Sequence, residues 1–282
     1  MSRAERVRSR IFRRGSRTYF NSTRFFPAPV RRDVRALYAF VRTADDLVDG
    51  TPQDGAGFEA FRREYLRRRG GPSGPAGPVI DAFVELSGRR GFDPAWVDAF
   101  LESMAWDLSG RAYRSLEETL AYVYGSAEVI GLMMAGIMGL DERGSRPARL
   151  LGRAMQYINF IRDIQEDLDL GRTYLPGDEI RAAGLGSLRE DEARRAPDAF
   201  RGFVRDQIGR YRGWRAEAEA GFALMPSRFR VPVRTAADMY DWTAARIEAE
   251  PFVVYGGKVR PSRRRIVLRG IRNILRSGDG DR

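Results

Sequence analysis

The sequence predicts an all-α protein folded as a helical bundle. Nine segments carry apolar residues at helical spacing, and turn-forming residues separate them. No series of alternating apolar residues indicates strands, and no repeat or long linker divides the 282 residues. We therefore expect a single domain over residues 1–282. The nine predicted helices cover residues 30–49, 56–69, 78–90, 94–108, 116–140, 147–170, 198–225, 229–250 and 261–276.

Flanking residues support several of these boundaries. Asp93–Trp96 reads "DPAW", which places an N-cap aspartate before a proline at the first helical position. Ser115–Glu118 reads "SLEE", the pattern of a capping box. Stretches rich in glycine, proline or polar residues predict loops at 70–78, 141–147 and 184–197.

The charge and the missing residue types limit the possible chemistry. The net charge of +11 favours an anionic partner such as nucleic acid, a membrane surface or a small molecule. However, Lys258 is the single lysine, and such a bias toward arginine is also typical of genomic base composition. Cysteine and histidine are absent, which excludes disulfides, thiol nucleophiles, zinc sites with these ligands and histidine bases. Any metal must be held by oxygen, which favours Mg²⁺ or Mn²⁺.

The chain shows no membrane-spanning pattern and no signal peptide by composition. Its longest apolar run, "VIGLMMAGIMGL" at 129–140, falls short of the roughly 18–20 residues that a span needs. It therefore predicts a buried helix. The first residues, "MSRAERVRSRIFRRGSR", lack the apolar core of a signal peptide. We expect a cytoplasmic protein.

Two predicted helices carry acidic side chains on one face. In "YAFVRTADDLVD" (38–49), Asp45 and Asp49 are four residues apart, with Arg42 and Tyr38 on successive turns before them. In "QYINFIRDIQEDLDLGRTYLP" (156–176), a second polar stripe is flanked by Arg162 and Glu166. It consists of Gln156, Asn159, Asp163 and Asp167.

These two acidic faces suggest a shared cation site. Like charges one turn apart repel, and burying them is costly unless a counter-charge is present. If the helices face each other, their four aspartates and Asn159 could hold two or three Mg²⁺, whose remaining positions a diphosphate would fill. Such ions make diphosphate a good leaving group. The alternative is two solvated helix faces bridged by arginine.

With these motifs, the chain resembles the squalene/phytoene synthase family, the head-to-head trans-isoprenyl diphosphate synthases, and most of all phytoene synthases. Two acidic motifs, "RTADDLVD" and "QYINFIRDIQEDLDLGRTYLP", carry the likeness. Ser126, Glu128 and Lys258 depart from residues usual in the family. Further similar segments are "SRTYF" (16–20), "WDLSGRAY" (106–113), "YVYGSAEVIGLMM" (122–134) and "VYGGKVRPSRRRI" (254–266).

The resemblance implies a class I isoprenoid synthase bundle around a central apolar cavity. It implies Mg²⁺-dependent 1–1′ condensation of two prenyl diphosphates through a cyclopropylcarbinyl diphosphate. Two geranylgeranyl diphosphates would give phytoene. Two farnesyl diphosphates would give dehydrosqualene or squalene, and only squalene formation needs NADPH.

The resemblance also assigns roles to residues. Asp45, Asp49, Asn159, Asp163 and Asp167 would bind the metal ions and, through them, diphosphate. Ser16, Tyr38, Arg42, Gln156, Arg162, Arg172 and Tyr174 would contact substrate, the last two from a loop that could exclude water. Catalysis would involve the four aspartates with Tyr122 and Tyr240, whose aromatic faces can stabilise a passing cation. Ordinary core packing is the alternative for each tyrosine.

The C-terminal segment 258–277 combines eight basic residues with Ile266, Val267, Ile271, Ile274 and Leu275. This basic amphipathic pattern suits an anionic membrane surface, which would place the protein on the inner membrane face. Packing of the apolar residues on the bundle is the alternative.

Two other classes of function compete with the synthase. A non-catalytic subunit that binds prenyl diphosphate would retain the site without turnover. A basic helical nucleic-acid-binding protein would explain the charge but neither acidic face, and the chain has no recognisable motif for reading bases. We therefore expect no nucleic acid partner. The sequence does not predict the oligomeric state.

Overall fold

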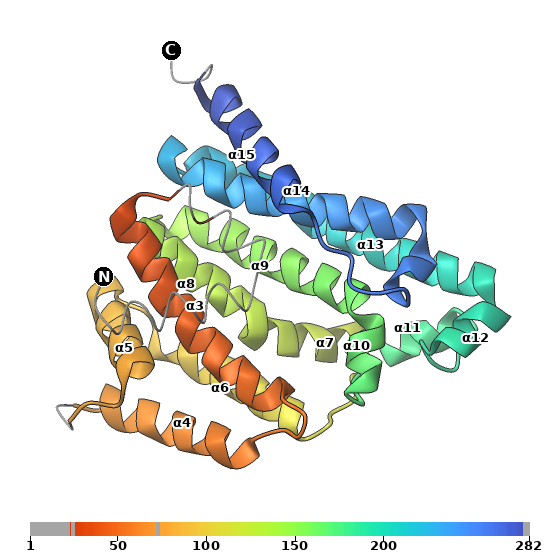
Figure 1. The fold of residues 1–282 in the computed structure, drawn as a ribbon, viewed down its shortest axis with the longest axis horizontal. Helices are drawn as coiled ribbons and strands as arrows, with labels where there is room; N and C mark the ends of the chain where they lie inside the picture. The colour runs from red at the N-terminus through yellow and green to blue at the C-terminus, as the bar shows by residue number, and fades with distance from the viewer. Residues whose placement is uncertain (1–22, 24–25, 72–73, 279–282) are drawn as a thin grey trace.

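In the computed structural model, the predicted all-α bundle is confirmed (Figure 1). The structure describes residue 23, residues 26–71 and residues 74–278, and no strand occurs in these ranges. The helices are α3 (Ala28–Asp49), α4 (Gly55–Arg69), α5 (Pro78–Arg90), α6 (Pro94–Leu108), α7 (Leu116–Val123), α8 (Val129–Met138), α9 (Glu142–Arg162), α10 (Ile164–Asp169), α11 (Gly177–Ala182), α12 (Glu190–Arg195), α13 (Pro197–Glu219), α14 (Ser227–Ala249) and α15 (Arg263–Gly278). Shorter turns are the π-helical η2 (Tyr124–Glu128) and the 3₁₀-helical η3 (Ala220–Leu224) and η4 (Pro251–Val254).

Helix α9 runs through the centre of the bundle and packs against α8, α13 and α14 (Figure 1). Its buried residues include Ala154, Tyr157 and Ile158, which are fully enclosed. On the other side of the molecule, α3 packs against α4, α5 and α6. There Phe40 of α3 stacks on Phe83 of α5 with ring centroids 3.9 Å apart. The polar residues of α3 and α9 are thereby held on the two sides of one interior space.

A buried ion pair also ties α3 to α5. Asp33 is 5% exposed and accepts hydrogen bonds from Arg89 Nη2 and Arg90 Nε, both at 3.0 Å. Burial raises the pKa of Asp33, but the hydrogen bonds and charges of the two arginines outweigh it and leave the pKa below 3.8.

The predicted helix caps form as expected, with one difference. Ala95 N–H donates to the Asp93 side chain at 2.9 Å, and Glu118 N–H donates to Ser115 Oγ at 3.3 Å. The Glu118 carboxylate reaches Arg114 N–H at 2.8 Å, one residue before the position of a standard capping box.

Two long predicted helices are interrupted in the structure. The segment 116–140 contains the π-helical turn η2, and helical structure ends at Met138. The segment 147–170 begins earlier, at Glu142, and breaks at Asp163, whose φ of −101° and ψ of 16° are not helical. Leu116–Met138 is long and apolar enough to cross a membrane, but more than half of its most apolar window is buried, as in a core helix.

The predicted loop at 141–147 is wrong over six residues, because α9 begins at Glu142. The predicted loop at 184–197 is wrong over seven residues, because Pro197 begins α13 and Glu190–Arg195 forms α12. Acidic side chains occupy its first turn and arginines its last, which suits the helix dipole. Arg195 also pairs with Asp191 one turn earlier at 2.7 Å. The charge pattern of this polar segment therefore favours a short helix over a loop.

Candidate active site

The candidate residues within the described ranges line one cavity of about 600 Å³. Ser16 lies outside those ranges. The structure thus brings together thirteen predicted site residues from four parts of the chain: Tyr38, Arg42, Asp45, Asp49, Tyr122, Gln156, Asn159, Arg162, Asp163, Asp167, Arg172, Tyr174 and Tyr240.

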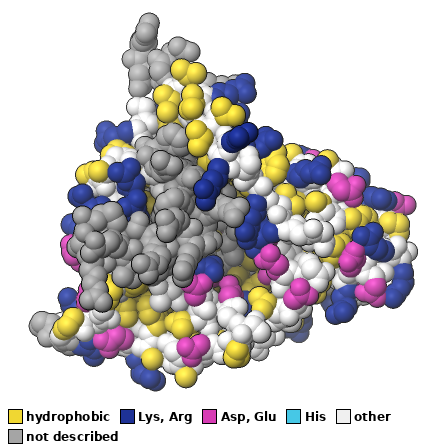
Figure 2. All heavy atoms as spheres, viewed as in Figure 1, with side chains coloured by type: hydrophobic (Ala, Val, Ile, Leu, Met, Phe, Trp, Pro, Cys, Tyr) yellow, Lys and Arg dark blue, Asp and Glu magenta, His cyan; other side chains and the backbone are white. Residues whose placement is uncertain are grey.

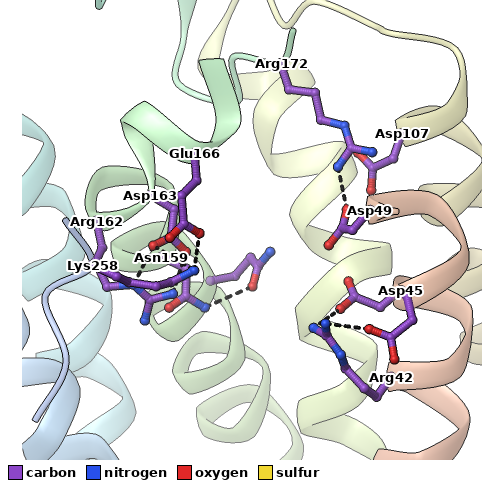
Figure 3. Close-up of polar contacts among 12 residues, drawn as sticks. Arg42, Asp45, Asp49, Asp107, Asn159, Arg162, Asp163, Glu166, Arg172 and Lys258 are labelled. Carbon is purple, nitrogen blue, oxygen red and sulfur yellow. Dashed lines mark hydrogen bonds and ion pairs between the residues drawn. The ribbon is translucent and has the colours of Figure 1, made fainter. Parts of the chain in front are cut away.

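One wall of the cavity is the C-terminal half of α3 (Figure 3). Arg42 forms ion pairs with Asp45 and with the adjacent Asp46. Asp49, one turn further, accepts a hydrogen bond from Arg172 Nη1 at 2.6 Å. Arg172 is only 6% exposed, and its Nη2 also donates to the carbonyl of Val48 at 2.7 Å. The loop after α10 is thereby tied to the end of α3.

The opposite wall is formed where α9 ends and α10 begins (Figure 3). Asp163 lies at this break and accepts a hydrogen bond from Arg162 Nε at 2.7 Å. Lys258 approaches Asp163 Oδ1 at 3.4 Å and forms a second ion pair with Glu166. The break replaces the single straight stripe expected from the sequence, yet Asn159, Asp163 and Asp167 still line the same cavity.

Burial and mutual repulsion raise the pKa of several carboxyls in the cavity. Asp167 reaches a pKa of about 8 because burial, and then the charges of Asp163 and Asp49, disfavour its ionised form. For Asp45, burial and the charge of Asp49 likewise raise the pKa. The side chain of Asp45 is 31% exposed and lines the cavity. A bound cation would offset this burial and repulsion and would favour the ionised carboxylates.

Asp107 of α6 is a functional candidate that the sequence reasoning did not single out. It is 6% exposed and accepts hydrogen bonds from Tyr122 Oη at 2.8 Å and from Tyr174 Oη at 2.7 Å. Burial raises its pKa to about 6, against the lowering effects of the Tyr174 hydrogen bond and the Arg172 charge. Asp107 thus fixes both tyrosines.

A pattern in the sequence does indicate Asp107. It lies three residues after Met104 and seven after Phe100, so it falls on the apolar face of α6. An acid on a buried helix face needs partners, as the two tyrosines confirm.

The donor set suits a hard cation that is shared with a ligand. Among the residues that the structure describes, no three acidic side chains converge closely enough to hold an ion by themselves. The two acidic walls instead face each other across the cavity (Figure 3), so an ion on either wall would need further oxygen ligands. Asn159 Oδ1 is buried beside the cavity without a hydrogen-bond partner, as expected of an oxygen that coordinates a cation. We conclude that the residues fit Mg²⁺ or Mn²⁺ bound together with an anion.

A second, mainly apolar cavity of about 210 Å³ adjoins the first. Its lining includes Met134 and Met138 of α8 and Met155 of α9. Six residues line both cavities and form a largely polar collar between them: Tyr38, Val41, Ser126, Gln156, Asn159 and Tyr240. A diphosphate in the acidic cavity could therefore extend a hydrocarbon tail past the collar into apolar surroundings.

Two residues connect η2 and α8 closely to α9. A Cβ on Gly131 would lie 2.3 Å from the carbonyl oxygen of Ala148, so this glycine allows α8 and α9 to approach. Glu128 is 1% exposed and bonds to Arg149 and Arg153 of α9 at 2.8 and 2.6 Å. The residue at position 128, which departs from the one usual in the family, is therefore an ion-paired carboxylate.

The helical bundle and the paired acidic walls define a class I isoprenoid synthase fold. The family model described as squalene/phytoene synthase matches residues 12–270 of the chain. The chain therefore belongs to the squalene/phytoene synthase family, and it is a prenyltransferase that acts in head-to-head prenyl condensation. The family generally uses a divalent metal to bind diphosphate.

Curated relatives support this membership. A 15-cis-phytoene synthase of Paracoccus sp. (strain N81106 / MBIC 01143) is 32% identical over 83% of this chain and 78% of its own. A 15-cis-phytoene synthase of Pantoea ananas is 31% identical over 83% and 79%. Phytoene synthase 3, chloroplastic, of Zea mays is 31% identical, and the matched region is 86% of this chain but 58% of the plant protein.

Solved structures show the same fold. A squalene synthase from Alicyclobacillus acidocaldarius matches with a TM-score of 0.77 and 25% identity, over 88% of this chain and 94% of that one. A dehydrosqualene synthase in complex with a ligand matches with a TM-score of 0.78 and 20% identity, over 98% and 95%.

Proposed function

We propose that this enzyme condenses two geranylgeranyl diphosphates to phytoene in a Mg²⁺-dependent reaction. The choice of C20 substrate rests on the phytoene synthases among its relatives. The observation that carries the proposal is the placement of both acidic faces on one cavity, with an apolar cavity directly behind the collar. This arrangement provides separate surroundings for a diphosphate and for its hydrocarbon tail.

The arginines of the cavity would bind and orient the diphosphate. Arg42, Arg162 and Arg172 each bond to a carboxylate in the structure and present planar guanidinium groups that suit phosphate oxygens. Metal ions bound by the aspartates and Asn159 would neutralise the charge that develops on the leaving diphosphate. After this ionisation, the C1 carbon of the allylic cation would be attacked by the double bond of the second substrate.

Two tyrosines would face the cationic intermediates. Tyr240 belongs to the collar, and Tyr122 lines the acidic cavity beside it. Tyr122 is held by Asp107, so its ring orientation is fixed. An aromatic ring can stabilise a nearby cation without adding to it covalently. Tyr174, held by the same carboxylate, belongs to the segment that would exclude water from the cation.

The experiment is an incubation of purified protein with Mg²⁺ and either C15 or C20 prenyl diphosphate, with and without NADPH. Mass analysis of the extracted hydrocarbons identifies the product. A C40 product without NADPH is the expected result. A C30 product would change the assigned product from phytoene to dehydrosqualene, or to squalene if its formation requires NADPH. No condensed product under any of these conditions would contradict the proposal.

A pair of variants tests the site itself. Asp167→Asn removes a carboxylate from the acidic cavity, and turnover should fall by about a hundredfold or more because charge on the leaving group is less well stabilised. Asp198→Asn is the matched control, since this aspartate of α13 is 97% exposed. Equal turnover in the two variants would contradict a role for Asp167 in the reaction.

A further inference from the structure

Helix α15 exposes an unusual amount of apolar surface. Of eight exposed large hydrophobic side chains in the part of the chain that the structure describes, five lie on this one helix. Leu268 and Leu275 are 67% and 69% exposed. The full set, which we call the α15 stripe, is Val267, Leu268, Ile271, Ile274 and Leu275. The spacing of these residues places them along one side of the helix.

The α15 stripe is not the side by which the helix joins the bundle. Ile266 is fully buried against the bundle, and Asn273 is 2% exposed. Asn273 Nδ2 donates to Asp238 of α14 at 2.8 Å, and Arg269 Nε donates to the same carboxylate at 2.6 Å. Of the five apolar residues named from the sequence, only Ile266 packs inward, so bundle packing does not account for the other four.

Positive charge accompanies the α15 stripe. Helix α15 contains no acidic residue, and four of its arginines are exposed: Arg263, Arg264, Arg265 and Arg272. Figure 2 shows the hydrophobic side chains gathered beside Lys and Arg side chains at the end of the molecule where Figure 1 places α15. A helix with one apolar side and a cationic edge is typical of proteins that lie on anionic lipid.

The helix begins at the wall of the acidic cavity. Lys258, Arg260, Pro261 and Arg263 all line that cavity, and Arg263 is the first residue of α15. Any external surface on which α15 docks would therefore also lie close to the site where substrate would bind.

We propose that α15 docks on an anionic phospholipid surface, with its apolar stripe among the outer acyl carbons and its exposed arginines at the lipid phosphates. Charge complementarity favours this occupant over two others. A second copy would bring another helix without acids against the same arginines. The segment 1–22 of this chain has seven arginines and one glutamate, so it too would be repelled.

Docking would also give a hydrocarbon product a short path into a bilayer. This role rests on the proposed function, whereas lipid binding itself does not. The two can therefore fail separately.

The test is sedimentation of the full-length protein with vesicles of phosphatidylglycerol and phosphatidylcholine, compared with phosphatidylcholine alone, without substrate. The double variant Leu268→Gln, Leu275→Gln should bind the anionic vesicles at least about tenfold more weakly, because each leucine loses its transfer to lipid. Leu66→Gln, Leu224→Gln is the matched control, since both leucines are exposed on other elements, α4 and η3. Arg264→Gln, Arg272→Gln should weaken binding by about fivefold per arginine at low salt.

Equal vesicle binding by the stripe variant and its control would overturn the proposal, as would wild-type protein that stays in solution with anionic vesicles. A dimer in light scattering that the stripe variant converts to a monomer would assign the surface to a second copy instead. Turnover of detergent-dispersed substrate should be unchanged in the stripe variant, because neither leucine lines a cavity. Lost turnover with normal vesicle binding would count against a docking role for the stripe.

Discussion

Arg172→Gln tests whether one guanidinium organises the acidic site. In the structure, Arg172 bonds to Asp49 at 2.6 Å, to the carbonyl of Val48 at 2.7 Å and to Tyr174 Oη at 3.3 Å. Tyr174 in turn donates to Asp107. Glutamine is shorter and neutral, so it cannot replace the full set.

The magnitude follows from these contacts. A lost hydrogen bond to a charged group costs about 1.5–3 kcal/mol, and breaking a fully buried ion pair costs about 3–5 kcal/mol. Because the side chain of Asp49 is 36% exposed, water can partly replace its partner. We therefore expect the free energy of unfolding to fall by about 2–3 kcal/mol. For a chain of 282 residues this lowers Tm by about 3–5 °C.

The assay is thermal unfolding followed by circular dichroism in metal-free buffer, with turnover measured in parallel. Arg195→Gln is the control, because its pair with Asp191 joins side chains that are 72% and 58% exposed and contributes at most about 1 kcal/mol. Turnover should fall about a hundredfold in Arg172→Gln, and Arg172→Lys should lie between it and the wild type. A Tm within about 1 °C of the control, with kcat/KM within about threefold of the wild type, would refute the reasoning.

Three further outcomes are expected. Asp33→Asn should lower the free energy of unfolding by about 2 kcal/mol at pH 7. Because the pKa of Asp33 is lowered in the folded protein, this contribution is full above pH 3.8 and is lost as the pH falls through the folded-state pKa. The denaturation curves of variant and wild type should therefore converge in strong acid. Gly131→Ala should destabilise the protein by about 1–3 kcal/mol in urea unfolding, because the added Cβ would lie 2.3 Å from a carbonyl oxygen. Gly202→Ala is the control: it has open space around it and should stabilise the protein by up to about 1 kcal/mol. Mg²⁺ and pyrophosphate together should raise Tm by more than the sum of their separate effects, and additive shifts would contradict a shared site.

The sequence predicted what depends on local pattern. Helical spacing and caps placed α5 and α6 at their observed bounds, and the acidic stripes predicted which faces of α3 and α9 line the cavity. The break at Asp163 and the π-helical turn η2 were not predicted, because the apolar spacing of the sequence continues through both. In η2, a Cβ on Gly125 would lie 2.3 Å from the carbonyl of Ala99, an approach that helical periodicity does not reveal. The pairing of Asp107 with two tyrosines likewise joins residues far apart in the chain.

The ion pairs within the cavity connect cation binding to diphosphate binding. Asp45, Asp49 and Asp163 each bond to an arginine, so a cation must compete with a guanidinium for the same carboxylate oxygens. Diphosphate offers those guanidinium groups another partner with suitable geometry. Each ligand should therefore free the residues that the other needs. On this argument, Arg172→Gln should increase the Tm response to Mg²⁺ alone, because Asp49 is released, whereas a residue that only contacts diphosphate would leave that response unchanged.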